Sequence, residues 1–234
     1  LLLSGFGVVS MALVFLLNNF VAMVVNLLIV LRRHLKLESL DLSFLRQQLT
    51  TGLPFVFISV LYILDNRLDN IILSVVSTEE EIGLYGAATA VILAIGMIPQ
   101  GYRTAILPVL SKYQESQMAK LRDLYERSFK YLLLLGLPIG VGGFLLAEDI
   151  VWLLYQRELP TAVMSLQIML LTTFMVFVNV LNMRLLIVFN RQSAVAVILL
   201  ITAAINALLN LQLSGQLGAV GAAVARAVST TILF

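Results

Sequence analysis

The side chains most able to do chemistry in this chain are five polar residues in an otherwise apolar stretch, residues 53–76. They are Tyr62, Asp65, Asn66, Asp69 and Asn70. Spacings of three and four residues place them on one broad helix face, with Asp65 and Asp69 one turn apart. Such a face suits a hydrophilic pathway that binds a polar substrate or a coupling ion. The alternative is that these charges pair with side chains elsewhere and only hold helices together.

Four arginines in or near the apolar stretches, one of them in this same stretch, are the cationic counterpart of this face. They are Arg67, Arg103, Arg184 and Arg226. Arg67 lies roughly 200° around its helix from the two acids, so we expect it to point to another helix or to a different wall of a cavity. Guanidinium groups that line a cavity suit a phosphate or pyrophosphate, because they are planar and permanently charged. For Arg103 and Arg184, near the ends of their segments, contact with lipid phosphate is an equal alternative.

Two asparagines, Asn206 and Asn210, share one face of a later apolar stretch. Hydrogen bonds between helices, worth about 1 kcal/mol each, are the simpler explanation for such a pair. A role in lining the cavity is the other interpretation.

Several classes of site are excluded by composition. The chain has no cysteine and one histidine, His34, which argues against thiol chemistry, a metal site or a Ser-His triad. It has no G-x-x-x-x-G-K-[ST] motif, so it contains no ATPase engine of that type. A net charge of +2 without a basic stripe gives no case for nucleic acid. We therefore expect no catalytic residue, no metal and no cofactor, and we predict that the protein is not an enzyme.

The elements that carry these residues are membrane-spanning helices. The chain is 60% hydrophobic and 12% charged, with a mean hydropathy of +1.00, whereas soluble domains carry about 25% charged residues. The apolar stretches long enough to span, or nearly so, are residues 6–31, 53–76, 84–107, 129–147, 162–189, 194–213 and 219–234. The fold class is therefore an all-α, polytopic bundle with about seven transmembrane helices. Because both ends lie within apolar runs, we expect the chain to be the interior and rear of a longer protein.

Lysines and arginines alternate between the connections and so predict the topology. The connections at residues 32–52, at 108–128 and around 191 are basic, whereas the intervening ones are acidic or uncharged. We predict that the three basic connections are cytoplasmic. Residues 37–49 and 112–130 are also amphipathic, which fits either a helix on the membrane surface or a solvated connector.

A series of short motifs follows in a fixed order along the chain. They are Asp69-Asn-Ile-Ile-Leu, Ile82-Gly-Leu-Tyr-Gly-Ala-Ala, Leu107-Pro-Val-Leu-Ser-Lys, Asn206-Ala-Leu-Leu-Asn and Gly218-Ala-Val-Gly-Ala-Ala-Val-Ala. Each alone is common in membrane proteins, and the specificity lies in their order and spacing. From about residue 5 to the end, the chain resembles the polysaccharide-exporter branch of the multidrug/oligosaccharidyl-lipid/polysaccharide flippase superfamily, which includes O-antigen repeat-unit flippases of lipopolysaccharide synthesis.

This resemblance implies about 12 to 14 helices in two lobes around a central cavity. Residues 1–31 would be the last helix of the first lobe, residues 32–52 a cytoplasmic amphipathic linker, and residues 53–234 the second lobe, truncated in the twelfth helix. Asp69 would match the characteristic aspartate of the seventh helix. Asn206 and Asn210 would match the paired asparagines of the eleventh.

The implied function is a flippase of the cytoplasmic (inner) membrane that exports a lipid-linked oligosaccharide or polysaccharide precursor by alternating access. Its partners would be membrane lipids, an undecaprenyl-linked oligosaccharide and polysaccharide-assembly proteins. Our head-group candidates, from charge and depth, are Arg67 and Arg226, followed by Arg103 and Arg184. Asp65 and Asp69 are the candidates for coupling to protons or sodium.

The two acids are awkward for an anionic cargo. Either one carboxyl is protonated, or both face a coupling cation or an arginine from elsewhere. A multidrug/cation antiporter or a lipid II flippase of the same superfamily is therefore an alternative. A membrane glycosyltransferase or polymerase is an alternative from another class, against which the short outer connections argue.

Overall fold

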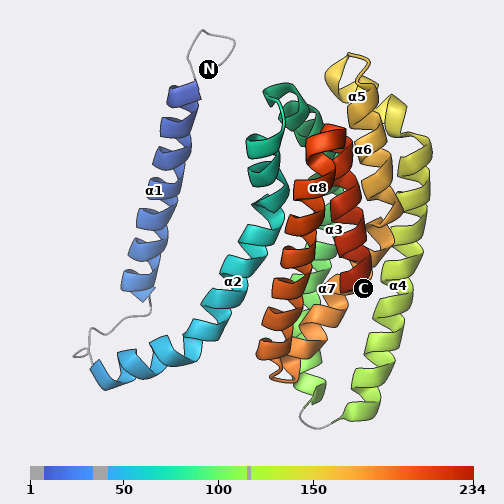
Figure 1. Cartoon of the computed structure of the whole chain (residues 1–234). Helices are drawn as coiled ribbons and strands as arrows, with labels where there is room; N and C mark the ends of the chain where they lie inside the picture. The colour runs from blue at the N-terminus through green and yellow to red at the C-terminus, as the bar shows by residue number, and fades with distance from the viewer. Residues whose placement is uncertain (1–7, 34–41, 115–116) are drawn as a thin grey trace. The chain divides into compact units, whose positions relative to one another are not determined.

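The chain is built from α-helices, as its apolar stretches predict. The computed structural model describes residues 8–33, 42–114 and 117–234, and every regular element in these ranges is an α-helix (Figure 1). The helices are α1 (Val8–Arg33), α2 (Leu42–Val76), α3 (Glu79–Gln114), α4 (Met118–Leu145), α5 (Ala147–Tyr155), α6 (Pro160–Leu171), α7 (Thr173–Val188) and α8 (Gln192–Leu233). The predicted all-α fold class is confirmed.

Two compact units divide the chain, residues 1–49 and residues 50–234. The first contains α1, and the second contains most of α2 and all later helices. The second unit therefore carries every predicted site residue. Part of the predicted linker, residues 34–41, lies outside the described residues. Helix α2 begins at Leu42 and runs through the rest of the predicted linker without a break.

Length and hydropathy allow three of the described helices, α3, α4 and α8, to cross a membrane. A fourth crossing results if α6 and α7, which are bent by 46° at their junction, are taken together. The apolar part of α1, Leu13–Ile29, is shorter, and α2 is interrupted by the charges of Asp65, Arg67 and Asp69. Six of the predicted stretches lie within the described residues and fall on α2 to α8; the first, residues 6–31, falls on α1 from Val8 onward, and its residues 6–7 lie outside the described residues.

The bend between α6 and α7 occurs at Thr172, where the sequence has neither proline nor glycine. The Thr172 hydroxyl donates to the carbonyl of Met169 at 3.0 Å, and the backbone N–H of Thr172 bonds the same carbonyl at 3.2 Å. This tighter local bonding competes with the regular helical ladder and ends α6. The single span predicted for residues 162–189 is therefore two helices.

A tight reversal divides α8 into two arms at Gly218. This residue has φ 54° and ψ −131°, a conformation that glycine adopts without strain. Glu81, at the start of α3, accepts a hydrogen bond from the backbone N–H of Ala219 at 2.6 Å and so caps the second arm. Figure 1 shows the two arms, orange and red, folded back beside each other. The reversal brings residues of both arms to the same depth of the bundle.

The connections of the second unit lie alternately at its two ends. At one end, Tyr113 of α3, Leu121 of α4 and Phe189 after α7 belong to one apolar cluster. At the other, Ala88 of α3 and Val151 of α5 share a second cluster. Within this unit, the basic connections at 108–128 and around 191 thus lie at one end and the acidic ones at the opposite end, in the alternation that the charges predict. That the basic end faces the cytoplasm stays a prediction.

Two apolar contacts hold helix α2 against α8, one before and one after the polar residues along the helix. Leu73 is fully buried in a cluster with Ala222 and Ala223 of the second arm. Leu61, three turns earlier, packs with Val195 and Leu199 of the first arm. These contacts set the height and rotation of the residues between them, which include both acids.

Candidate functional site

The carboxylate of Asp69 lies at the centre of a buried polar network. Its Oδ1 atom accepts hydrogen bonds from the side-chain amides of Asn206 and Asn210, each at 2.8 Å. Its Oδ2 atom accepts from the hydroxyl of Tyr85 at 2.7 Å and from Nε of Arg226 at 2.8 Å. Because Asp69 is 2% exposed, these four donors replace the water that an ionised carboxylate requires.

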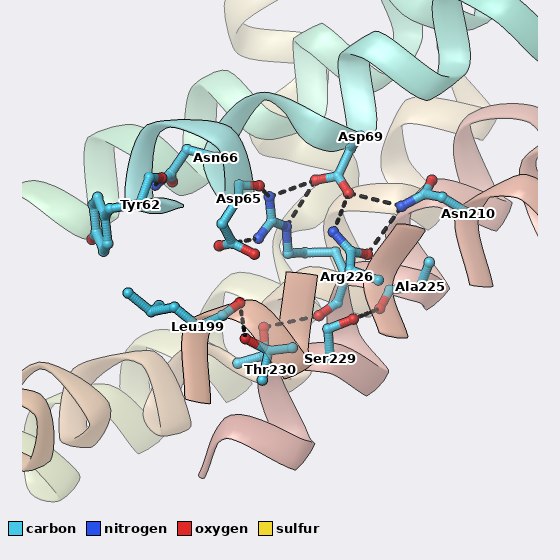
Figure 2. Close-up of polar contacts among 12 residues, drawn as sticks. Tyr62, Asp65, Asn66, Asp69, Leu199, Asn210, Ala225, Arg226, Ser229 and Thr230 are labelled. Atoms are coloured by element: carbon cyan, nitrogen blue, oxygen red, sulfur yellow. Dashed lines mark hydrogen bonds and ion pairs between the residues drawn. The ribbon is translucent and has the colours of Figure 1, made fainter. Parts of the chain in front are cut away.

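Arg226 joins the two acids of α2 (Figure 2). Its Nη2 atom lies 2.7 Å from Oδ2 of Asp69, and its Nη1 atom lies 2.9 Å from Oδ2 of Asp65. Nη2 also donates to the backbone carbonyl of Asp65. Each nitrogen of the guanidinium therefore contacts an oxygen atom of α2. Of the explanations open for the two acids, the structure provides an arginine from elsewhere, which here comes from the second arm of α8.

The two asparagines extend this network along the first arm of α8. The amide of Asn210 also donates to the side-chain oxygen of Asn206 at 3.0 Å, and Ser214 donates to the side-chain oxygen of Asn210 at 2.8 Å. Asn206 and Asn210 are fully buried. They serve as hydrogen-bond donors to Asp69, and thus hold helices together as the simpler interpretation expects.

The chemistry of this acid–arginine network follows from its charges. Two carboxylates and one guanidinium sum to a formal charge of −1. Since Arg226 is surrounded by oxygen atoms of α2, it offers no open pair of N–H groups to a phosphate. Asp65, whose side chain is 19% exposed, is the more accessible acid, whereas Asp69 is enclosed. Within the described ranges, no three histidine, cysteine or acidic residues gather in a way that could hold a metal ion.

A second cluster, which contains cations but no described acid, lies between α2, α3 and α7. The guanidinium of Arg103 lies over the ring of Tyr62, with Cζ 5.8 Å from the ring centroid. Arg184 of α7 is close enough for its charge to interact with Arg103 and Tyr62. Gln100, one turn before Arg103, donates to the Tyr62 hydroxyl at 3.2 Å. We call Arg103 and Arg184 the arginine pair.

The arginine pair has no acidic partner among the residues that the structure describes. Neither guanidinium lies within 4.0 Å of a described carboxylate, and the buried Nε of Arg103 has no hydrogen-bond acceptor. Two like charges within electrostatic range of each other are costly in an apolar bundle unless an anion or water meets them.

The predicted site residues thus fall into two clusters and one outlier. The first contains Asp65, Asp69, Asn206, Asn210 and Arg226, and the second contains Arg103 and Arg184. Arg67 belongs to neither, because its side chain is exposed and forms no hydrogen bond or ion pair within the described residues. Arg67 and Arg226 were our first candidates for binding the head group. Within the described residues, Arg67 has no partner, whereas the guanidinium of Arg226 is fully occupied by oxygen atoms of α2.

Two members of these clusters were not singled out from the sequence. Tyr85 lies within the Ile82-Gly-Leu-Tyr-Gly motif, yet only its contact with Asp69 gives it a role. Gln100 follows Pro99 in an apolar stretch, and a polar residue at that depth was the available signal. Both lie on the side of α3 that faces α2, and hydropathy alone does not indicate which side of α3 that is.

The fold of this chain is that of transporters in the MATE and MOP group. A crystal structure of MATE in complex with MaD3S aligns with a TM-score of 0.70 at 16% identity, over 78% of this chain and 42% of that one. A MOP superfamily transporter from Pyrococcus furiosus, described as having a binding pocket of reverse polarity, and MATE in the straight conformation each align with a TM-score of 0.69 at 16% identity. Each covers 78% of this chain, which spans about two fifths (41%) of either structure.

The family follows from the sequence itself. The model of a family described as "Polysaccharide biosynthesis protein" matches residues 1–163, more than half of the chain, and the chain belongs to that family. No curated protein matches the sequence. The apolar helices and the transporter fold make this a multi-pass membrane protein, and the predicted resemblance to the superfamily is confirmed.

Proposed function

We propose that this chain is part of a flippase that moves a lipid-linked oligosaccharide or polysaccharide precursor from the cytoplasmic to the outer face of the cell membrane. Family membership and fold support a transporter that serves polysaccharide synthesis. The cargo would be a saccharide on an undecaprenyl diphosphate carrier, such as an O-antigen unit of lipopolysaccharide. Its polar head would cross within the protein while its tail stays in lipid. We assign no catalytic residue, because this step makes and breaks no covalent bond.

The observation that carries this proposal is the arginine pair. Arg103 and Arg184 bring two permanent positive charges into electrostatic range of each other without a described acidic partner. The buried Nε of Arg103 is an unused donor. A diphosphate would supply both the missing negative charge and the missing acceptors, and guanidinium groups bind phosphate oxygens with paired hydrogen bonds. The head group therefore binds at the arginine pair, rather than at Arg226.

The acid–arginine network would serve a different purpose from the head-group site. With a formal charge of −1, it repels a phosphate and favours a proton or a sodium ion. Asp65, which is partly exposed and held by Arg226, is the acid that could exchange such an ion. We therefore keep Asp65 and Asp69 as the ion-coupling candidates of alternating access, with Asp69 positioned by its four donors.

A cation antiporter of the same fold is the second candidate, and the excess negative charge of the network is the observation that favours it. An organic cation would require open carboxylates. In the structure Arg226 already occupies both acids, and an antiporter does not explain the arginine pair. A lipid II flippase shares the diphosphate chemistry and differs only in the saccharide.

The test uses cells that lack the gene for the full-length protein. We expect carrier-linked saccharide to accumulate inside the cell while the matching surface polymer disappears. The double variant R103Q/R184Q should fail to restore the polymer. R157Q, a matched change at an exposed arginine between α5 and α6, should restore it. Unchanged levels of both species after deletion would contradict the polysaccharide assignment, and export of cationic dyes would then favour the antiporter.

A further inference from the structure

The polar face of α2 carries two acids and three neutral polar residues. Asp65 and Asp69 bond to Arg226 of α8, whereas Tyr62 and Asn66, on the same broad face, form no bond to that guanidinium (Figure 2). Tyr62, Asn66 and Asn70 form one line along this face, since they are each four residues apart. We call these three residues the Tyr62 stripe.

The Tyr62 stripe is neutral, accessible and rich in unused hydrogen-bonding groups. Tyr62 is 40% exposed, Asn66 is exposed and Asn70 is half-buried. The Asn66 amide group donates to the carbonyl of Tyr62 at 2.7 Å, which leaves its side-chain oxygen without a described partner. Asn70 forms no hydrogen bond within the described ranges. Two amides left open to hydrocarbon would be costly, so the stripe needs polar partners such as water, another helix or a polar ligand.

The stripe begins at the arginine pair. The Tyr62 ring lies 5.8 Å from Cζ of Arg103 and receives the Gln100 amide at its hydroxyl. From Tyr62 the stripe runs along α2 for about 12 Å, at 1.5 Å per residue. A ligand with one anionic end and one neutral, hydroxyl-rich end would therefore meet suitable groups in spatial order. Its anionic end would contact Arg103, and its neutral end would contact an aromatic ring and then amides.

We propose that the Tyr62 stripe binds the saccharide of the cargo and makes the site selective for a carrier that bears sugar. This rests on the proposed function, in which the arginine pair binds the diphosphate. Sugar hydroxyls both donate and accept hydrogen bonds, as amides do. The C–H face of a sugar ring is apolar and packs on an aromatic ring, while the tyrosine hydroxyl keeps a polar contact. A site made only of charged groups would offer neither the paired donors and acceptors nor the aromatic contact.

A simpler role for Tyr62 is to hold Arg103 in place through the contact of its ring with the guanidinium. The two roles predict different results. A residue that only positions Arg103 affects every diphosphate ligand equally, whereas a residue that binds saccharide affects only the ligand that carries it.

The experiment measures the affinity of the purified full-length protein for two probes, undecaprenyl diphosphate and undecaprenyl diphosphate N-acetylglucosamine. We expect the wild-type protein to prefer the second probe. Y62L should weaken binding of that probe by about threefold to tenfold and leave binding of the first unchanged. N70A should reduce the preference in part. Y131L, at an exposed tyrosine of α4, is the matched control and should change neither affinity.

Equal affinity of the wild-type protein for the two probes would overturn the inference. So would an equal loss of both affinities in Y62L, which would assign Tyr62 to the positioning of Arg103. The head-group proposal fails separately: if R103Q/R184Q binds both probes as tightly as wild type, the diphosphate site is wrong. A Tyr62-dependent preference for the sugar-bearing probe would still support the saccharide stripe in that case.

Discussion

Nη2 of Arg226 lies 2.7 Å from the Asp69 carboxylate, although the two residues are 157 positions apart in the sequence. The contact depends on the reversal of α8 at Gly218. In a straight helix, Asn210 and Arg226 would be about 24 Å apart, yet both bond to Asp69. The acid therefore ties both arms of α8 to α2, and the stability of this unit should depend on it.

Replacement of Arg226 by leucine should be strongly destabilising. It would leave the carboxylates of Asp65 and Asp69 close together without their cation, and removal of one partner from a buried ion pair costs about 3–5 kcal/mol. Thermal unfolding of the purified protein in detergent measures the effect. The double variant D69N/R226L should be more stable than R226L, because it removes one of the two uncompensated charges. A Tm for R226L equal to that of wild type would contradict this role.

The two acids should differ in importance. Asp69→Asn disturbs four hydrogen bonds in an enclosed site, and we expect a loss of about 3 kcal/mol. Asp65→Asn disturbs one side-chain contact at a partly exposed position, and about 1 kcal/mol is expected. Unfolding midpoints of the two variants, compared side by side, provide the check. The reverse order of stability would show that Asp65, rather than Asp69, is the anchor.

The reversal of α8 should tolerate only glycine. A Cβ at Gly218 would collide with Oε2 of Glu81, and the positive φ adds backbone strain of about 1–3 kcal/mol. Gly218→Ala should therefore lower the Tm clearly. Gly215→Ala is the matched control three residues earlier, where a Cβ meets nothing within 4 Å. Equal Tm values for the two variants would contradict the observed geometry.

Helices α4 and α7 approach closely at Gly136. A Cβ there would lie 2.8 Å from Cα of Phe174, so that the two backbones would have to separate. We expect Gly136→Ala to lower the yield of folded protein and its Tm by an amount typical of overpacking, about 1–3 kcal/mol. Gly142→Ala, on the same helix with no atom near its Cβ, should behave like wild type. Size-exclusion profiles and unfolding curves distinguish the two variants.

The sequence predicted local features of the site better than its long-range pairing. Helical spacing was sufficient to place Asp65 and Asp69 on one face, and the motif order identified Asn206 and Asn210. The sequence did not show which cation pairs with the two acids, because Arg226 reaches them only through the Gly218 reversal. A contact of this kind depends on how helices pack, which hydropathy and spacing do not specify.

Other differences have equally local causes. The break at Thr172 arises from a side-chain hydrogen bond within an apolar run that reads as one continuous span. The role of Tyr85 depends on the rotation of α3 toward α2. Arg67, which its angle around the helix separates from the two acids, forms no ion pair with either, and the described residues include no second helix that binds it.

The most direct test of the account is to measure movement of a lipid-linked saccharide across proteoliposomes that contain the full-length protein. The central claim is that the arginine pair carries the anionic head group. We predict that wild-type protein and R157Q move undecaprenyl diphosphate N-acetylglucosamine at the same rate. R103Q/R184Q, folded to the same Tm, should fall to the rate of protein-free vesicles. Undiminished movement by R103Q/R184Q would contradict the account.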